Sequence, residues 1–495
     1  MIRRSLVLSL IVMSSAALTV AMLTNGHDWG DDFAGHIIQA SGLLHGTARE
    51  AVAHIASIME GSSRSYAPVA YPWGFPALLA LFYQGCGGLN IFCLKLINIP
   101  LFALFLLAFF LLLIRRLPLV DSALVLSVLA FSPVLLPFHN NVLPDLAFLA
   151  FSTLSLLLIE NIIVRPGRPE GSPLANVYLG FVLFATYALR INGILLIPAL
   201  FFTQAIVYAR RHVRGTAWKR LLPAAAIPYV VFGLLALALK MLLPGGEASY
   251  FSHFRPLTVE GLSLNLSTYF ALPIEFFYAI PHPDILYGAL LPFVIAGIVL
   301  HLAEDVHALI YVGLTLLLLI VWPEQQGLRY MFPILPFGVY YSYRGMRATA
   351  SAFSDSYRRS GEHLTRVCWM AILLMFVVAS FGVARANLVR GGAPEDGPFD
   401  APSGELFAWI STHTAPESVV IFAKPRVMRL MTERDALLID TCDQLSRGTY
   451  VVIRRTGDLA NQVQPGEVAT CNPLLERTPA FENQTFAVYR MLPRP

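Results

Sequence analysis

Residues 1–36 of the chain read MIRRSLVLSLIVMSSAALTVAMLTNGHDWGDDFAGH. Two arginines, Arg3 and Arg4, precede an apolar run of about twenty residues, the length that a helix needs to cross a bilayer. A cleaved signal peptide also begins with basic residues and ends in small ones. This run is longer than the hydrophobic region of most signal peptides, so we interpret it as a retained first membrane helix.

The composition of the whole chain points the same way. Of its 495 residues, 56% are hydrophobic and 13% are charged, whereas a soluble domain averages about 45–50% apolar and about 25% charged residues. The net charge of +4 gives no reason to expect nucleic acid as a partner. Five cysteines without close paired spacing exclude a disulfide scaffold and a zinc ribbon. Cys442 and Cys471 can pair if the C-terminal segment lies in an oxidising compartment.

The hydropathy pattern predicts eleven membrane helices. Several are shorter than a full span, which leaves room for tilted or re-entrant segments. The predicted spans are residues 5–24, 90–114, 122–137, 146–164, 177–189, 193–209, 221–243, 285–302, 308–322, 331–343 and 367–384.

The lysines and arginines are distributed as the positive-inside rule requires if the N-terminus is cytoplasmic. An odd number of helices then places the C-terminus outside. The connection at residues 303–307 fits least well, because it carries Glu304 and Asp305. The cytoplasmic connections hold Arg115, Arg116, Arg165, Arg168, the cluster at 209–220, Arg344, Arg347, Arg358, Arg359 and Arg366, and the external ones hold Arg49, Arg64, Arg190, Arg255 and Arg329.

Three external segments are long enough to hold a functional site: residues 25–89, residues 244–284 and everything after about residue 387. In the first, the stretches 33–44 and 73–83 are too short to span and predict helices at the membrane surface. In the second, the aromatic-rich stretch 262–279 is typical of a segment at the headgroup level.

The composition changes after Leu388, where residues 390–404 form a Gly/Pro-rich linker. Ser403 is the predicted N-cap of a following helix. We expect strands at VVIFA, ALLID and TYVVIRR, with a short helix at PRVMRLMT between the first two. The chain is therefore predicted to divide into a membrane domain (1–386) and a small external α/β domain (387–495).

The stretch HDWGDDFAGHIIQA, residues 27–40, holds the densest group of ionisable side chains outside the predicted spans. Asp32 and His36 share one face if it is helical. The simplest interpretation is a solvated helix N-terminus, where acids suit the helix dipole. The alternative is a functional site, because ionisable groups close to the membrane interior are costly.

An acidic pair directly after the first helix resembles the GT-C superfamily of membrane glycosyltransferases, in particular the branch of protein O-mannosyltransferases and lipid A aminoarabinose transferases. Three further stretches match that branch in order: YPWGFPALLALF from Tyr71, HNNVLPDLAFL from His139 and LRYMFPILP from Leu328. The resemblance covers the membrane part, about four fifths of the chain. It implies an all-α polytopic membrane fold of GT-C type, in a bacterial inner membrane, with the external α/β domain appended.

The resemblance also implies a reaction, the inverting transfer of a sugar from a polyprenyl-phosphate carrier to an external lipid, glycan or protein. Such a transfer needs a base for the acceptor hydroxyl, and either Asp31 or Asp32 can serve. The acidic order of the family favours Asp31, whereas counting back from the family's aromatic position favours Asp32. This chain has His36 at that aromatic position, and the choice stays open.

Two arginines are candidates for the donor phosphate, because a guanidinium forms charge-assisted, often bidentate hydrogen bonds with phosphate. Arg329 belongs to the LRYMFPILP motif, and Arg190 is predicted at another external helix end. The alternative for each arginine is that its side chain only extends from a helix end to the lipid headgroups.

The remaining candidates are substrate contacts. Asp145 is either an ordinary first-turn acid after Pro144 or a contact to sugar, acceptor or arginine. Aromatic side chains are suited to stack on a sugar or to anchor a loop in the interface. The candidate substrate-binding residues are His36, Tyr71, Trp73, Asp145 and Tyr330.

A monophosphate donor implies no obligatory cofactor, because arginine can neutralise it. A divalent cation at His27, Asp28, Asp32 and His36 stays open, although these residues share no recognised ligand spacing. Three other functions compete: a transporter or flippase for lipid-linked saccharides, a scaffold acting through its external domain, and a ligase using a lipid-diphosphate donor. The transporter interpretation lacks an inverted repeat.

Overall fold

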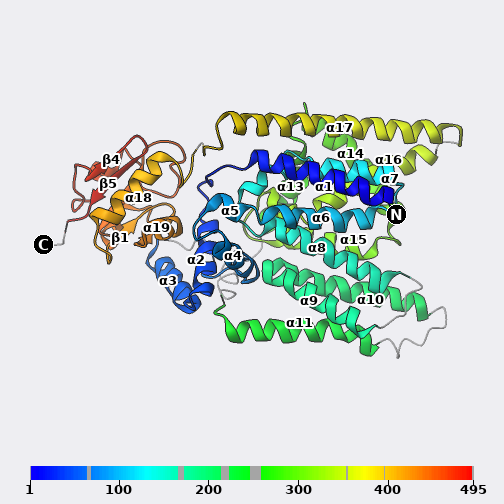
Figure 1. The fold of residues 1–495 in the computed structure, drawn as a ribbon, viewed down its shortest axis with the longest axis horizontal. Coiled ribbons are helices and arrows are strands. Elements are labelled where there is room, and N and C mark those ends of the chain that lie inside the picture. The colour runs from blue at the N-terminus through cyan, green and yellow to red at the C-terminus, as the bar shows by residue number, and fades with distance from the viewer. Residues whose placement is uncertain are drawn as a thin grey trace.

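The computed structural model describes residues 2–63, 68–165, 172–212, 222–245, 258–352, 355–394 and 396–492. A bundle of long helices fills most of the molecule, and a small sheet domain lies beyond one end of it (Figure 1). Three short helices from the first connection lie between the bundle and this domain. Arg64, Arg168, Arg255 and most of the cluster at 209–220 lie outside the described residues.

The chain is a polytopic membrane protein, with a helix at each of the eleven predicted spans. Seven described segments are long and apolar enough to cross a membrane, and three more apolar helices are shorter. The bundle helices are α1 (Ile2–Met22), α6 (Asn98–Leu113) after α5 (Ile91–Lys95), α7 (Leu119–Ala130), α8 (Asp145–Ile159) continued by the π-helix η2 (Glu160–Val164), α9 (Pro173–Leu189), α10 (Leu196–His212) after η3 (Ile191–Leu195), α11 (Leu222–Leu242), α14 (Pro283–His301), α15 (Val306–Val321), α16 (Leu335–Ala352) and α17 (Asp355–Val389).

Two predicted spans were wrong at their ends. The span 122–137 stops early because α7 ends at Ala130, before Pro133 and Pro137, which lack the N–H that a helix interior needs. The span 331–343 starts too early, since residues 328–331 form the 3-10 helix η6 (Leu328–Met331) and α16 begins after Pro333.

The acidic connection at 303–307 is neutralised by arginines from the end of the bundle where it lies. Asp305 forms ion pairs with Arg116 and Arg344, and Glu304 lies 2.8 Å from Arg344. The acids therefore offset basic residues predicted on the same side, and the misfit to the positive-inside rule is explained by pairing.

The first connection contributes α2 (Asp32–Leu44), α3 (Ala48–Gly61) and α4 (Gly74–Gly85). The helices predicted at 33–44 and 73–83 correspond to α2 and α4, while α3 was not predicted. A disulfide between Cys86 and Cys93, also not predicted, joins the end of α4 to α5. In the second connection, the aromatic stretch forms α13 (Val259–Ala271) and the 3-10 helix η5 (Leu272–Phe277).

The C-terminal domain begins with α18 (Ala401–His413). Its N-cap is Asp400, whose Oδ1 accepts the Ser403 N–H at 2.8 Å, so the prediction of Ser403 as the cap was wrong. A five-stranded sheet follows, in the order β2-β1-β3-β5-β4. Its elements are β1 (Val419–Ile421), α19 (Pro425–Thr432), β2 (Asp435–Leu437), η7 (Cys442–Arg447), β3 (Tyr450–Arg454), α20 (Val468–Cys471), β4 (Phe481–Glu482) and β5 (Phe486–Arg490).

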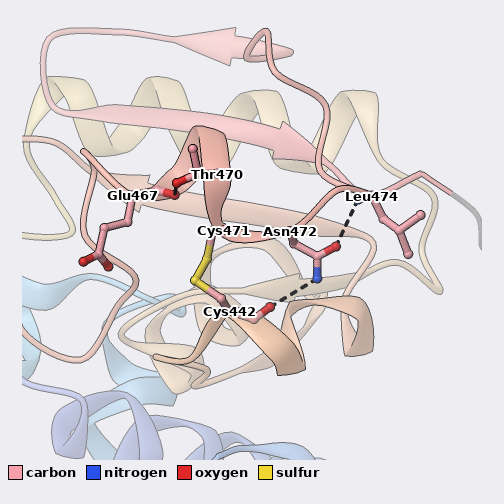
Figure 2. The surroundings of a disulfide bond; sticks show 6 residues. All are labelled: Cys442, Glu467, Thr470, Cys471, Asn472 and Leu474. Carbon is pink, nitrogen blue, oxygen red and sulfur yellow. Dashed lines mark hydrogen bonds between the residues drawn. A yellow bond between two sulfur atoms is a disulfide. The ribbon is translucent and has the colours of Figure 1, made fainter.

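The sheet of this domain is mixed. The three predicted strands pair in parallel, with β1 between β2 and β3, whereas the unpredicted β5 runs antiparallel to both β3 and β4. Cys442 and Cys471, whose pairing the sequence left conditional on an oxidising compartment, form a disulfide (Figure 2). The Asn472 amide donates to the Cys442 carbonyl at 3.2 Å beside this bond.

The C-terminal domain shares one hydrophobic core with the first connection. Phe33 and Phe75, from α2 and α4, are fully buried in the same cluster as Phe407, Phe422 and Phe486. Burying apolar area of this kind contributes about 25 cal/mol per Å². The domain is therefore packed directly onto the helices of the first connection.

Candidate active site

A cavity of about 300 Å³ opens at the end of the bundle that faces the C-terminal domain. Its walls come from α2, the segment before α4, the start of α8, the end of α9 and residues 322–330. Seven of the nine residues proposed from the sequence line it: Asp32, His36, Tyr71, Asp145, Arg190, Arg329 and Tyr330.

Asp32, the first residue of α2, is the acid of the pair that faces the cavity. Its Oδ1 accepts the Tyr71 hydroxyl at 2.7 Å, and its Oδ2 lies 3.3 Å from Arg329 Nη2. The side chain keeps 35% of its surface exposed. Burial alone would raise the pKa of Asp32, but the charge of Arg329 and the Tyr71 hydrogen bond lower it below its usual value. The carboxylate is therefore ionised at neutral pH.

Asp31 points the other way, into the contact with the C-terminal domain, and does not line the cavity. Its Oδ1 accepts the backbone N–H groups of Arg426 at 3.1 Å and Val427 at 3.3 Å. These groups belong to the first turn of α19, where a carboxylate suits both the unpaired donors and the helix dipole. Burial raises the pKa of Asp31 to about 6. Asp31 therefore contacts the C-terminal domain, whereas Asp32 lines the cavity.

His36 and Tyr71 form an aromatic wall next to Asp32. The two rings lie 4.1 Å apart, and Phe75 meets His36 edge-on at 5.2 Å. Burial lowers the pKa of His36 to about 3, so the imidazole is neutral. The close approach requires Gly35, because a Cβ there would lie 2.7 Å from Tyr71 Cε2.

Another part of the lining carries two cations that both lie near the ring of Tyr330. Arg190, the C-cap of α9, lies 2.5 Å from Asp145 Oδ1, and its guanidinium carbon is 4.2 Å from the centroid of Tyr330. The Arg329 guanidinium is 5.2 Å from the same centroid. Burial would lower the pKa of Arg329, but Asp145, Tyr330 and Asp32 raise it above its usual value. The cavity therefore combines the ionised Asp32 with the guanidinium groups of Arg190 and Arg329.

Trp73 lies outside this cavity. Its indole N–H donates to the Pro244 carbonyl at 2.8 Å, just after α11, and its ring packs with Ala48, Val52 and Ala70. This contact joins the first connection to the end of a bundle helix. It matches the anchoring alternative for Trp73 more closely than sugar stacking.

The four residues considered for a metal are not brought together. His27 Nε2 accepts the Val142 N–H at 3.0 Å, and His27 also pairs with Asp28, whereas Asp32 and His36 face the cavity. Within the described ranges, no group of three or more His, Cys, Asp or Glu residues has the arrangement of a metal site.

Sequence reasoning missed Arg426, a fully buried arginine of α19 that reaches this site from the C-terminal domain. Its Nη1 donates to the Tyr71 hydroxyl at 2.5 Å and lies 4.0 Å from Asp32. One signal was available, because a cation in the first turn of a helix opposes the helix dipole. Glu324 and Gln326, which also line the cavity, carried no such signal.

No family model matches the chain, and no curated protein sequence matches it either. Solved structures do match. ArnT from Cupriavidus metallidurans, both in the apo state and bound to undecaprenyl phosphate, aligns over 97% of each chain at 13% identity with a TM-score of 0.57.

The archaeal oligosaccharyltransferase AglB from Archaeoglobus fulgidus, in complex with an inhibitory peptide and a dolichol-phosphate, also matches. The alignment covers 90% of this chain and 69% of AglB, at 11% identity and a TM-score of 0.55. A complex of the same oligosaccharyltransferase with Zn and sulfate aligns over 90% of this chain and 68% of that one, at 10% identity and a TM-score of 0.53. Identities this low establish architecture alone, and the architecture is that of the GT-C superfamily. The protein has a GT-C fold.

Proposed function

We propose that the protein is an inverting glycosyltransferase that moves a sugar from a polyprenyl-phosphate carrier to a hydroxyl of a lipid, glycan or protein acceptor. The observation that carries the proposal is the cavity itself, which brings the ionised Asp32 together with Arg190 and Arg329 at the end of a membrane bundle. The ligands of the structural neighbours, undecaprenyl phosphate in ArnT and a dolichol-phosphate in AglB, support a lipid-phosphate donor.

The proposed chemistry is a single in-line displacement with Asp32 as general base. The acceptor oxygen forms a bond to the anomeric carbon while its proton passes to the Asp32 carboxylate. The bond from the anomeric carbon to the phosphate oxygen breaks, and the electron pair leaves with the polyprenyl phosphate. Attack from the opposite face inverts the anomeric configuration.

Arg329 and Arg190 are proposed to hold the phosphate as its negative charge grows. A guanidinium can offer two parallel N–H groups to two phosphate oxygens. In the structure Arg329 contacts Asp32 and Arg190 contacts Asp145, so a phosphate would compete for charges that are already in place. Neutralising Arg329 in this way would remove the largest of the charges that lower the pKa of Asp32. Donor binding would therefore make Asp32 a stronger base.

The sugar is proposed to lie between the aromatic wall and the paired cations. Tyr71, His36 and Tyr330 offer ring faces, and the neutral His36 can hydrogen-bond a hydroxyl without placing another charge in the site. Asp145 is proposed to orient Arg190, which it contacts directly. Trp73 acts by anchoring the first connection.

A divalent cation is not required by this mechanism, because two guanidinium groups can neutralise a monophosphate. Asp32, Asp145 and Glu324 are the described carboxylates that line the cavity, and the first two each contact an arginine. We therefore expect chelation with EDTA to leave the transfer rate unchanged.

The direct test uses purified protein in nanodiscs, a radiolabelled polyprenyl-phosphate sugar, and membranes of a deletion strain as the acceptor source. We expect label to enter the acceptor fraction and free polyprenyl phosphate to be released, with and without EDTA. Transfer from a nucleotide sugar alone, or from a polyprenyl-diphosphate saccharide alone, would contradict the proposed donor. The glycan missing from the deletion strain would identify the acceptor.

Orientation in the membrane is a separate prediction. The arginine bias places the N-terminus in the cytoplasm and residues 387–495 on the outer side of a bacterial inner membrane. We expect alkaline phosphatase fused after Pro495 to be active and a fluorescent protein at the same position to be dark. The opposite pattern would reverse the topology and remove the oxidising environment that a Cys442–Cys471 disulfide needs.

A further inference from the structure

Arg426 is the one charged side chain of the C-terminal domain, among those described, that contacts Tyr71 at the cavity. It lies in the first turn of α19 and is fully buried. Its Nη2 donates to the Pro68 carbonyl at 2.6 Å, and its Nη1 donates to the Tyr71 hydroxyl. The guanidinium therefore fixes the segment that carries Tyr71 from both ends.

The direction of the hydrogen bonds gives this contact its consequence. A guanidinium has donors only, and a phenol has a single O–H. Because Arg426 donates to the Tyr71 oxygen, the one Tyr71 proton is free to point at Asp32 Oδ1, 2.7 Å away. Tyr71 is itself neutral, since burial raises its pKa well above the usual value. The two hydrogen bonds therefore run in one direction, from Arg426 to Tyr71 and from Tyr71 to Asp32, the proposed base.

Arg426 is held in place by the first connection itself. Asp31 accepts the Arg426 backbone N–H and lies 3.8 Å from its side-chain Nε. The residues involved are 395 positions apart in the chain. Asp31 therefore anchors the arginine, and the arginine orients the neighbour of Asp32.

We propose that Arg426 is a positioning residue through which the docked C-terminal domain sets the geometry and charge of Asp32. This inference rests on the proposed function, since it assigns Arg426 a role only through the general base. It gives the C-terminal domain a part in the reaction beyond covering the bundle. The domain completes the hydrogen-bond chain that keeps the base ionised.

Asp32 is surrounded by charged and titratable groups from several elements. These are Arg329 on η6, Tyr71 before α4, Arg426 on α19, and His36 and Asp31 on the first connection. Arg329, Tyr71 and Arg426 each lower the pKa of Asp32. Removing Arg426 therefore raises the pKa of Asp32. Because the base is active only when it is ionised, its activity should then begin to fall at a higher pH as the solution is made more acidic.

The test measures transfer against pH in Arg426→Gln, Arg426→Lys and Tyr71→Phe. We expect the acidic limb of the kcat profile to move to higher pH in Arg426→Gln and Tyr71→Phe, with less movement in Arg426→Lys, which keeps the charge. In the two Arg426 variants the KM for the polyprenyl-phosphate donor should stay near its original value, because Arg426 does not line the cavity. In the double variant Arg426→Gln/Tyr71→Phe, the shift should be smaller than the sum of the two.

Arg434→Gln is the matched control. Arg434 lies in the same domain and bonds to Thr414 and Ser411 but not to the first connection in the described contacts. Its pH profile should match that of the original protein. A second variant, Arg454→Gln, removes the ion pair with Asp396 beside Trp29 and so loosens docking without touching Tyr71. It should lower the unfolding temperature while leaving the acidic limb in place.

Asp32→Asn separates this inference from the proposed function. If Asp32→Asn is inactive and folded Arg426→Gln keeps the original acidic limb, the positioning role is wrong and the proposed function stands. If Asp32→Asn is active, the proposed base itself is wrong. Should Arg426→Gln fail to fold, Tyr71→Phe decides, because it removes only the hydroxyl, and an unmoved limb in that variant overturns the inference.

Discussion

Replacing Asp32 by asparagine lowers the transfer rate by about 10²–10⁴-fold, the loss that removal of a general base produces. Asparagine keeps the shape of the side chain and can still accept the Tyr71 hydroxyl, but it cannot take a proton from the acceptor. The expected loss is therefore in kcat rather than in folding. The measurement is the transfer rate per folded molecule in nanodiscs, with saturating polyprenyl-phosphate sugar.

Asp31→Asn is the control that makes this result specific. The side-chain oxygen of asparagine can still accept the N–H groups of Arg426 and Val427, and the lost charge is one that burial already disfavours. We expect this variant to keep most of its activity.

The raised pKa of Asp31 means that its ionisation costs stability as pH rises from about 4 to about 6. Above that range the original protein has already lost this stability, so Asp31→Asn loses none of it. An inactive Asp31→Asn beside an active Asp32→Asn would reverse the assignment.

The choice between the two acids shows where sequence reasoning ends. Consecutive residues at a helix start point in different directions, so Asp31 and Asp32 face different neighbours. The neighbour that fixes Asp31 is α19, 395 residues away. A local pattern could place an acidic pair at the membrane surface. It carried no information about which of the two acids would contact the distant C-terminal domain.

The bundle was predictable for the opposite reason. A helix that crosses a bilayer must satisfy its backbone groups within the segment, so each apolar run reports its own structure. The sequence-based predictions failed where the backbone chemistry of proline or pairing between distant residues determined the structure. Pro133 and Pro137 ended α7 early, and the amphipathic α3 escaped detection. The strand β5 was missed because its pairing with β3 joins distant parts of the domain.

Of the nine residues proposed for the site, the seven that line the cavity come from four separate connections or helix ends. The ordered motifs starting at Tyr71, His139 and Leu328 supplied that grouping through their resemblance to a superfamily. Spacing alone did not supply it. The sequence offered an arginine as one partner of Asp145, but only the structure shows that Arg190 pairs with Asp145 and Arg329 with Asp32.

Substituting Arg329 tests the other half of the mechanism. If its guanidinium stabilises the departing phosphate, Arg329→Ala loses transition-state stabilisation on the order of 2.7–4 kcal/mol, which is about 10²–10³-fold in kcat. Arg329→Lys should recover only part of this loss, because an ammonium keeps the charge but not the planar pair of donors. The exposed Arg49 of α3 supplies the matched control, and Arg49→Ala should transfer sugar at the original rate.

The alternative for Arg329 makes different predictions. An arginine that only reaches from a helix end toward lipid headgroups is replaceable by lysine, and its removal lowers protein yield more than turnover. Loss of the guanidinium would also raise the pKa of Asp32, since Arg329 is the largest of the charges that lower it. If Arg329 binds the donor phosphate, its removal should therefore raise the donor KM and also move the acidic limb of kcat/KM, which reports the free enzyme, to higher pH. Full activity of folded Arg329→Ala, with an unchanged donor KM, would remove the phosphate contact and with it the reason to assign a lipid-phosphate donor to this cavity.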